Sequence, residues 1–459
     1  MMIRLNQHTL VLLLNLISMN KLFILKKKIS PYNKVLNIEG DKSISIRWAL
    51  LASQAYGKST STNLLKSEDV LSTLTCLKKL GVKIKIIKNK CHIYGLGLNG
   101  YKYKKNLLLN AGNSGTLSRL ILGLLIHSKK DVKIIGDKSL SKRDFLRITK
   151  PLEKFGARFK SNSGKLPIIV KGTKNPKPIK YIENKGSAQC KTAIMLASLN
   201  TKGQTIIKAK KSRDHSELLF KYLKLPIKLI KDKNNDLIKI NGGKKIKSFN
   251  YNIPSDISSA AFFIILTCLK NNSSMTINNV NINPSRIGII YILKKMGAKI
   301  IFKNKKIYNG EKIADIFVKS VKKLKAIKCP TKYNSSAIDE FLIIFIAAAK
   351  AKGISSFKNL SELNQKESPR LKIASKILNM IGIKTKLTSH SIKIFGDPNL
   401  KIKKNYKVKG FLKDHRVFMM STIAALTLGG NWTIHDPDSI KTSFPSFLKT
   451  VKKIGARIN

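Results

Sequence analysis

One short phrase recurs along the chain: an amphipathic stretch ending in a large apolar residue, then a glycine, then a β-rich segment. Its copies are CLKKLGVKIKII (76–87), PLEKFGARFK (151–160), YILKKMGAKIIF (291–302), ILNMIGIKTKL (377–387), VKKIGARIN (451–459) and the degenerate KYLKLPIKLI (221–230). A glycine after a helix ends it, because glycine adopts the left-handed conformation without steric cost. Copies spaced 70 to 85 residues apart divide the chain into six units.

Each unit also contains an earlier helix rich in small apolar residues. These helices are expected at 43–55, 114–126, 188–199, 257–269, 339–350 and 415–427. Stretches such as FLIIFIAAA are apolar on every face, which predicts burial. With β segments between the helices, each unit reads β-α-β-α-β-β. Six units predict an α/β fold with buried helices and outer sheets, three units in each of two lobes.

Basic residues dominate the charge of the chain. There are 89 Lys+Arg against 24 Asp+Glu, which gives a formal net charge of +65, yet 43% of the residues are hydrophobic. That apolar content excludes a disordered polycation. Only 11 of the basic residues are Arg, so most of the charge is Lys on solvated surfaces, and the scarce Arg residues are the informative ones.

Arginine gathers at the predicted helix starts, beside Ser, Asp and Asn. A cation there opposes the helix dipole by about 0.3–1 kcal/mol, and a bound anion would remove this cost. A planar guanidinium suits carboxylate or phosphate. For Arg119 and Arg286, bridging between helices is the alternative. The Arg residues in these clusters are Arg47, Arg119, Arg143, Arg213, Arg286, Arg370 and Arg416.

Other sequence features argue against metal, nucleotide and disulfide sites. The five cysteines lie far apart without metal-ligand spacing, and we expect them to be reduced thiols in a cytosolic protein. The G-x-G-x-x-G at 95–100 is followed by YKYKK rather than by a helix, unlike a dinucleotide fingerprint. Cys190 at a helix start is expected to be a small buried residue rather than a nucleophile.

The N-terminus carries a short apolar run, TLVLLLNLIS (9–18). It is too short to span a membrane, and no small-residue cleavage site follows it. We expect residues 1–28 to be a disordered extension or a start-site artefact, with Met19 as the true initiator. A signal or anchor segment and a flexible arm are the alternatives.

The polar clusters occur in an order that resembles a known family. Taken together they are specific, and S-A-Q followed by Lys191, K-E-S and T-S-F-P (442–445) resemble its class II branch. From about residue 29 onward the chain resembles the 5-enolpyruvylshikimate-3-phosphate synthases, the 3-phosphoshikimate 1-carboxyvinyltransferases. The motifs are GDKSISIR (40–47), GNSGT (112–116), SAQ (187–189), SRDH (212–215), IDE (338–340), KESPR (366–370) and DHR (414–416).

The resemblance implies two lobes that close over two small substrates. Lobe 1, residues 29–41 plus 253–459, is expected to carry the phosphoenolpyruvate and acid–base side. Lobe 2, residues 42–252, is expected to hold shikimate 3-phosphate. The implied reaction transfers the enolpyruvyl group to the 5-hydroxyl of 3-phosphoshikimate and releases phosphate, in the shikimate pathway to aromatic amino acids. The resemblance also implies a cytoplasmic protein, expected to be a monomer, with no metal or organic cofactor and no nucleic-acid or membrane partner.

The resemblance also assigns roles to individual residues. The acid–base candidates are Asp339 and Glu367, with Lys42 and Lys366 as catalytic cations. The 3-phosphoshikimate site is implied at Lys42, Ser43, Arg47, Ser187, Ala188, Gln189, Ser212, Arg213, Asp339 and Lys366. The phosphoenolpyruvate site is implied at Lys42, Asn113, Gly115, Thr116, Arg143, Gln189, Arg370 and Arg416. His415, in either a catalytic or a structural role, Lys441 and Thr442 are further candidates.

Departures from the family pattern remove none of these residues. Ile46 stands where the family has His, and Asp144 follows Arg143 where Pro is usual. Two rival functions are less well supported. UDP-N-acetylglucosamine enolpyruvyl transferases would show K-N where this chain has Lys42-Ser43, and a loop cysteine. A nucleic-acid-binding protein would show a basic stripe with interleaved aromatics, whereas lysine is scattered here and aromatics make up 7% of the chain.

Overall fold

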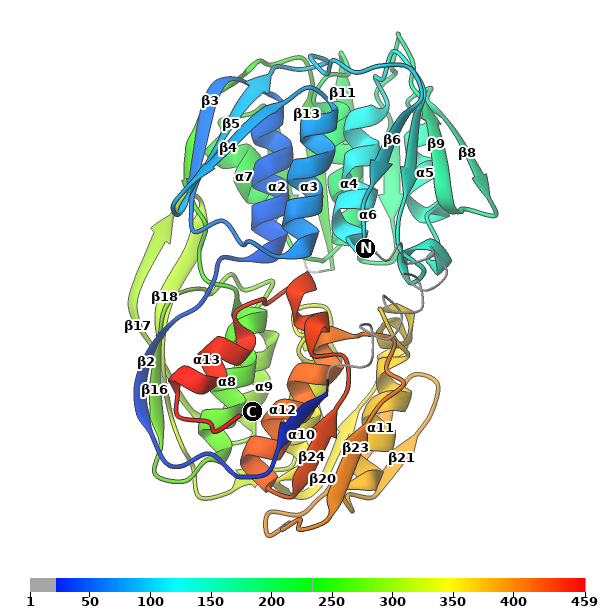
Figure 1. Ribbon diagram of the computed structural model, residues 1–459. Coiled ribbons are helices and arrows are strands. Elements are labelled where there is room, and N and C mark those ends of the chain that lie inside the picture. The colour runs from blue at the N-terminus through cyan, green and yellow to red at the C-terminus, as the bar shows by residue number, and fades with distance from the viewer. Residues whose placement is uncertain (1–21, 233, 459) are drawn as a thin grey trace, which may run out of the picture.

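The computed structural model describes residues 22–232 and 234–458, and these residues form two lobes (Figure 1). Their buried apolar side chains fall into two separate clusters. One cluster combines residues 23–38 with residues 257–456 and defines lobe 1. The other runs from residue 44 to residue 253 and defines lobe 2. The chain therefore crosses between the lobes twice, near residues 39–41 and 253–256.

Lobe 2 contains three repeats of the predicted unit. In the second and third, a buried helix lies between two parallel strands, and two more strands continue the sheet antiparallel. In the first, the parallel partners of the first strand come from a later segment of the chain. The first has α2 (Lys42–Ser53), β3 (Ala55–Thr62), α3 (Glu68–Lys79), β4 (Lys83–Ile87) and β5 (Lys90–Leu96). The second has β6 (Leu107–Asn110), α4 (Gly115–Leu125), β7 (Val132–Ile135), η1 (Leu140–Lys142), α5 (Leu146–Glu153), β8 (Arg158–Asn162) and β9 (Lys165–Lys171). The third has β10 (Lys180–Glu183), α6 (Ala188–Ser198), β11 (Gln204–Lys210), α7 (His215–Tyr222), β12 (Ile227–Lys231) and β13 (Asn235–Asn241).

Lobe 1 repeats the same plan (Figure 1). Its first unit has α8 (Ile257–Leu269), β16 (Ser274–Asn281), α9 (Gly288–Lys295), β17 (Lys299–Tyr308) and β18 (Glu311–Lys319). The second has β19 (Leu324–Lys325), η2 (Thr331–Tyr333), α10 (Phe341–Ala349), β20 (Ala351–Phe357), η3 (Ser361–Gln365), α11 (Arg370–Met380), β21 (Thr385–Leu387) and β22 (Ile392–Gly396). The third has β23 (Asn405–Val408), α12 (His415–Leu428), β24 (Asn431–Ile434), η4 (Pro437–Thr442) and α13 (Phe447–Lys453).

The two crossings exchange first strands between the lobes. Strand β2 (Asn33–Asn37) precedes lobe 2 in sequence but pairs with β16 in lobe 1. Strands β14 (Ile246–Lys247) and β15 (Asn250–Asn252) follow the third unit of lobe 2 and pair with β3 in its first unit. The crossings also contact each other, through a bridge between Gly40 and Ser255. A Cβ atom on Gly40 would lie 2.0 Å from the carbonyl oxygen of Asn63, so this close approach requires glycine.

The sixth unit departs from the predicted pattern, because the described chain holds no strand after α13. Instead β1 (Phe23–Leu25) pairs antiparallel with β24, at the position that the last strand occupies in the other units. Phe23 and Leu25 are buried in lobe 1. The expectation of a disordered extension through residue 28 was therefore wrong for β1, whose apolar side chains fill the open edge of this unit. Residues 1–21, with the apolar run and Met19, lie outside the described part.

The predicted buried helices and their glycine stops are confirmed. The six helices lie within two residues of their expected ends, and α8 and α10 are buried along almost their whole length. All five repeat glycines have positive φ, between 88° and 105°. In the degenerate copy Lys224 adopts φ 52°. Within the described residues, no helix is both long and apolar enough to cross a membrane.

Candidate active site

A polar cleft lies between the lobes, where the buried helices of both begin. Each predicted site residue except Lys441 and Thr442 lines it. The lining residues from lobe 2 are Lys42, Ser43, Arg47, Asn113, Gly115, Thr116, Arg143, Ser187, Ala188, Gln189, Ser212 and Arg213, and those from lobe 1 are Asp339, Lys366, Glu367, Arg370, His415 and Arg416. The cleft thus brings together residues up to about 370 positions apart in the sequence.

Capping side chains fix these helix starts. Asp41 accepts from the backbone N–H of Ile44, Ser114 from that of Leu117, and Ser187 from that of Cys190. In lobe 1, Asp256 and Asp414 cap α8 and α12 in the same way. The caps leave the following residues, such as Lys42 and Arg416, at the positive ends of helix dipoles. The sequence argument for anion binding at these positions therefore applies to the folded chain.

Several cationic and polar atoms in the cleft are buried without a hydrogen-bond partner. They include atoms of the Arg143, Arg370 and Arg416 guanidinium groups and the hydroxyl of Ser212. A buried donor left without a hydrogen bond costs about 1–3 kcal/mol. A ligand that brings acceptors to these groups would therefore be stabilised by them. Burial and the neighbouring Arg147 and Arg143 lower the pKa of Arg119 to about 9, and anions would relieve this crowding of cations.

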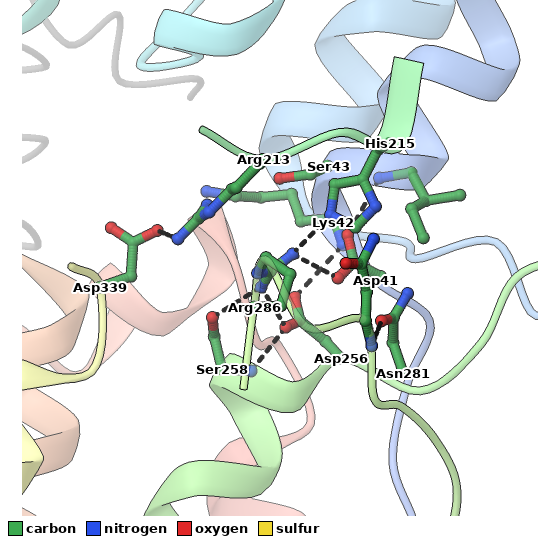
Figure 2. Close-up of polar contacts among 12 residues, drawn as sticks. Asp41, Lys42, Ser43, Arg213, His215, Asp256, Ser258, Asn281, Arg286 and Asp339 are labelled. Carbon is green, nitrogen blue, oxygen red and sulfur yellow. Dashed lines mark hydrogen bonds and ion pairs between the residues drawn. The ribbon is translucent and has the colours of Figure 1, made fainter. Parts of the chain in front are cut away.

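Asp339 is an ionised carboxylate in contact with the cations of lobe 2 and lobe 1. Its Oδ2 lies 2.5 Å from Arg213 Nη2 (Figure 2). Its Oδ1 lies 3.8 Å from Lys366 Nζ. Burial raises the pKa of Asp339, but Arg213, Lys366 and other cations outweigh burial and hold it well below 3.8. A carboxylate that stays ionised can accept a proton from a hydroxyl.

Glu367 is a second ionised carboxylate, with different neighbours. It pairs with Arg370 at 2.5 Å and with Arg143 at 3.5 Å. Burial raises its pKa, but Arg370, Arg143 and other neighbours outweigh burial and hold the pKa well below 4.5. Arg370 also lies 3.7 Å from Asp339, so it stands between the two carboxylates. Arg213 and Lys366 contact Asp339, and Arg143 contacts Glu367.

Side chains of lobe 2 hold one another in place. Arg47 donates from Nε to Ser216 Oγ at 2.9 Å and from Nη1 to the carbonyl of Ser43 at 3.0 Å. Gln189 donates to Thr116 Oγ1 at 3.2 Å and accepts from Arg119 Nη1 at 2.8 Å. Since Arg119 also lies over the ring of Phe145, its bridging alternative is the one that the structure supports.

The further candidates lie differently. His415 lines the cleft, and its Nδ1 lies 3.2 Å from Thr442 Oγ1, while its Nε2 has no partner. Burial and then Arg416 lower the pKa of His415 well below 6.5, so the ring is neutral. Thr442 reaches the cleft only through this histidine. Lys441 points away, with a side chain 54% exposed and paired with Asp438 at 2.8 Å.

Among the cleft residues that the sequence analysis assigned to neither substrate are Asp69 and Arg286. Asp69 accepts a hydrogen bond from Lys42 Nζ at 2.9 Å. Burial raises the pKa of Asp69. Arg286 is 1% exposed and is occupied by Asp41, Asp256 and Ser258, which matches its bridging alternative. Asp69 stands in the polar cluster at the start of α3, so its position was visible, but its pairing across 27 residues with Lys42 was not.

Metal-binding side chains are not grouped in the part of the chain that the structure describes. All five cysteines are buried free thiols. Cys190 has its pKa raised to about 12, mainly by burial, which favours the expected packing role over a nucleophilic one. The cleft offers carboxylates, among them Asp339 and Glu367, and many cations.

Comparison with known proteins agrees with this chemistry. The family model for EPSP synthase (3-phosphoshikimate 1-carboxyvinyltransferase) matches residues 26–451. The 3-phosphoshikimate 1-carboxyvinyltransferase of Ruthia magnifica subsp. Calyptogena magnifica is 41% identical over 439 residues, covering 94% of this chain and 98% of that protein.

Solved structures show the same fold. EPSP synthase from Acinetobacter baumannii superposes with a TM-score of 0.84 at 35% identity, over 95% of this chain and 99% of that one. The enolpyruvyl transferase NikO from Streptomyces tendae superposes with a TM-score of 0.76 at 12% identity, over 96% and 99%, and shares the fold alone. With a family model that matches residues 26–451 and a relative 41% identical over 94% of the sequence, the chain belongs to the EPSP synthase (3-phosphoshikimate 1-carboxyvinyltransferase) family.

Proposed function

We propose that this cleft transfers the enolpyruvyl group of phosphoenolpyruvate to the 5-hydroxyl of 3-phosphoshikimate and releases phosphate. The observation that carries the proposal is the set of buried cationic donors without a hydrogen-bond partner, which lie beside two ionised carboxylates. Both substrates are phosphorylated carboxylates, so their charges match this wall. Membership of the family supplies the identity of the substrates.

Lobe 2, residues 42–252, is proposed to bind 3-phosphoshikimate. Ser43 and Arg47 would hold its carboxylate, and Ser187, Ala188, Gln189, Ser212 and Arg213 its phosphate. The unpartnered Ser212 hydroxyl supports this assignment. The contacts of Arg47 with Ser43 and Ser216 support it too, because they orient the guanidinium before any ligand arrives.

Phosphoenolpyruvate is proposed to bind between the lobes, on the side of the cleft that holds Glu367. Lys42, Arg143, Arg370 and Arg416 would clamp it, with Asn113, Gly115, Thr116 and Gln189 as the lobe 2 wall. Gly115 supports this arrangement, since a Cβ atom there would lie 2.8 Å from Arg143 Nη1 and displace that guanidinium. Lobe 1, residues 29–41 plus 253–459, would supply the acid–base groups.

The reaction would proceed by addition and then elimination. In the addition, Asp339, assisted by Lys366, takes the proton of the 5-hydroxyl while the hydroxyl oxygen bonds to C2, and C3 gains a proton. In the elimination, C3 loses a proton and the bond from C2 to the phosphate oxygen breaks, which restores the double bond. The cations around the departing phosphate stabilise its charge.

Glu367 is proposed as the proton carrier at C3. In the free protein it is ionised, because Arg370 and Arg143 contact it. When phosphoenolpyruvate occupies these guanidinium groups, they are shared with the ligand, and the ligand adds negative charge beside Glu367. Both changes raise the pKa of a carboxyl group, so substrate binding would prepare Glu367 to hold the proton that C3 needs.

Acid, base and charge stabilisation suffice for this sequence of steps, so we infer that no metal ion or organic cofactor takes part. We infer also that the enzyme works as a cytoplasmic monomer, without nucleic-acid or membrane partners. The test is phosphate release from the purified protein with both substrates, and with each alone. Release that requires both substrates and survives a chelator supports the proposal, and release that either substrate gives alone contradicts it.

A further inference from the structure

The two crossings between the lobes end in the same way. Asp41 N donates to the carbonyl of Pro254 at 2.8 Å, and Asp256 N donates to that of Glu39 at 3.1 Å. Directly after the crossings, Asp41 caps α2 of lobe 2 and Asp256 caps α8 of lobe 1. The two helix starts therefore lie side by side at the hinge, each with a buried carboxylate.

One guanidinium joins these two carboxylates. Arg286, in lobe 1, donates from Nη1 to Asp41 at 2.8 Å and from Nη2 to Asp256 at 3.3 Å (Figure 2). Burial disfavours its charge, but Asp41 and Asp256 outweigh burial and raise its pKa above the ordinary value. A planar fork with fixed donors can bridge two acceptors in this way, and a lysine ammonium cannot reproduce that geometry.

A histidine of lobe 2 completes the junction. His215 Nε2 lies 3.0 Å from Arg286 Nη1, and its Nδ1 lies 2.6 Å from Glu311 of lobe 1. Since a guanidinium only donates, Nε2 must accept and Nδ1 must carry the hydrogen that Glu311 receives. The ring thus contacts two buried groups of lobe 1 and links the start of α7, next to Arg213, to the opposite lobe.

Arg286 is also connected by short chains of hydrogen bonds to the sequence neighbours of the proposed catalytic residues. Lys42 directly follows Asp41, and its backbone N–H donates to Asp256 at 3.3 Å. On the lobe 1 side, Arg286 Nη2 donates to Ser258 Oγ at 2.9 Å, and Ser258 donates to Glu340, the neighbour of Asp339. A shift of this guanidinium would therefore displace both Lys42 and the residue next to Asp339.

We propose that Arg286 is a positioning residue: by joining Asp41, Asp256 and His215 it sets the closed arrangement of the lobes, in which Lys42 and Asp339 face the same substrates. This inference rests on the proposed function of the cleft. It goes beyond that function because Arg286 is assigned no contact with either substrate. Misplacing reacting groups by about an ångström can cost a hundredfold in rate, so the cost should fall on kcat.

The test compares Arg286→Lys and His215→Asn with Arg158→Lys, a control on the exposed face of β8. His215→Asn can keep a donor for Glu311 but loses the acceptor for Arg286. Both variants are expected to lower kcat roughly 10- to 100-fold, with less than a threefold change in the KM of either substrate. In small-angle X-ray scattering with both substrates, they should also show a larger radius of gyration than wild type.

Other outcomes would overturn the inference. Wild-type kcat and closure in Arg286→Lys would do so, and so would a loss of thermal stability alone. A rise in KM for one substrate with kcat unchanged would identify Arg286 as a substrate ligand instead. The proposed function fails separately, if the wild-type protein releases no phosphate with both substrates present, and that result would remove the basis of this inference as well.

Discussion

Arg213 of lobe 2 and Asp339 of lobe 1 form an ion pair of 2.5 Å across the cleft. In the proposed function, the arginine binds the phosphate of 3-phosphoshikimate and the carboxylate accepts a proton. In the free protein Asp339 therefore lies where the substrate phosphate would contact Arg213. Arg213 likewise lies where the 5-hydroxyl would approach Asp339. An incoming phosphate would take over Arg213, leaving Asp339 with Arg370 at 3.7 Å and Lys366 at 3.8 Å as its remaining cations.

Arg213→Lys should raise the KM for 3-phosphoshikimate, because a lysine cannot form the bidentate contact of a guanidinium with phosphate. A hydrogen bond to a charged group is worth about 1.5–3 kcal/mol, which corresponds to roughly a 10- to 150-fold rise. The KM for phosphoenolpyruvate should change much less. Steady-state kinetics with one substrate varied at a time measures both, with Arg158→Lys as the control. Equal rises for both substrates would contradict the assignment.

Glu367→Gln should abolish most of the turnover while leaving substrate binding largely intact. Glutamine keeps the size of the side chain and can still contact Arg370, but it cannot carry the proton to C3. General acid–base catalysis contributes about 10²–10⁴-fold, so kcat should fall by that factor. Phosphate-release kinetics and calorimetric titration of both substrates provide the check. The control is Glu153→Gln, on the surface of α5. Retained turnover in Glu367→Gln would remove this residue from the mechanism.

The sequence predicted the repeat well, because its signals are local. A glycine stop such as Gly297 and an all-apolar helix such as α8 act through their immediate neighbours. The resemblance implied that residues 29–41 belong to lobe 1, but the strands with which β2 and β15 pair were not predicted, and neither was β1 at the edge of the sixth sheet. These pairings join segments hundreds of residues apart, and hydrophobic alternation within one strand does not identify its partner.

The site was predicted only in part, because local signals marked it while its long-range pairings left no signal in the sequence. Rare arginines at helix starts marked the cleft, since each conflicts locally with a helix dipole. Pairings across the fold were not visible, among them that of Lys42 with Asp69. Lys441 looked like a further cation for the phosphate, but its side chain lies on the surface beside Asp438. Charge alone could not separate these two lysines.

The buried neutral His415 should make the stability of the protein depend on pH. Its pKa in the folded state lies well below 6.5, so below pH 6.5 the unfolded chain takes up a proton that the folded chain does not. Stability contributed by this group is therefore present above pH 6.5 and is lost as the pH falls. The slope is at most about 1.4 kcal/mol per pH unit.

Urea unfolding of wild type and His415→Gln at pH 7.5, 6.5, 5.5 and 5.0 measures this effect. The difference in unfolding free energy between the two proteins should shift steadily against wild type below pH 6.5. Asp339 and Glu367 have lowered pKa values, so their contributions are lost only below the ordinary carboxyl range and do not interfere. The exposed His390→Gln serves as control and should run parallel to wild type. Parallel curves for His415→Gln would mean that this ring titrates normally.

Strand β1 should be required for the stability of lobe 1, whereas residues 1–18 should not. A chain that begins at Met19 keeps Phe23 and Leu25, which are 4% and 1% exposed. A chain that begins at Lys26 loses both, and burial of a large apolar side chain is worth about 1.5–3 kcal/mol. The shorter chain should therefore lose about 3–6 kcal/mol of unfolding free energy in urea, while the Met19 chain matches the full chain.

Within the Met19 chain, Phe23→Ala should reproduce much of this loss and Ile24→Ala, at a 39% exposed position, very little. A Met19 chain less stable than the full chain would instead show that residues 1–18 contribute to the fold, against the expectation that Met19 is the initiator.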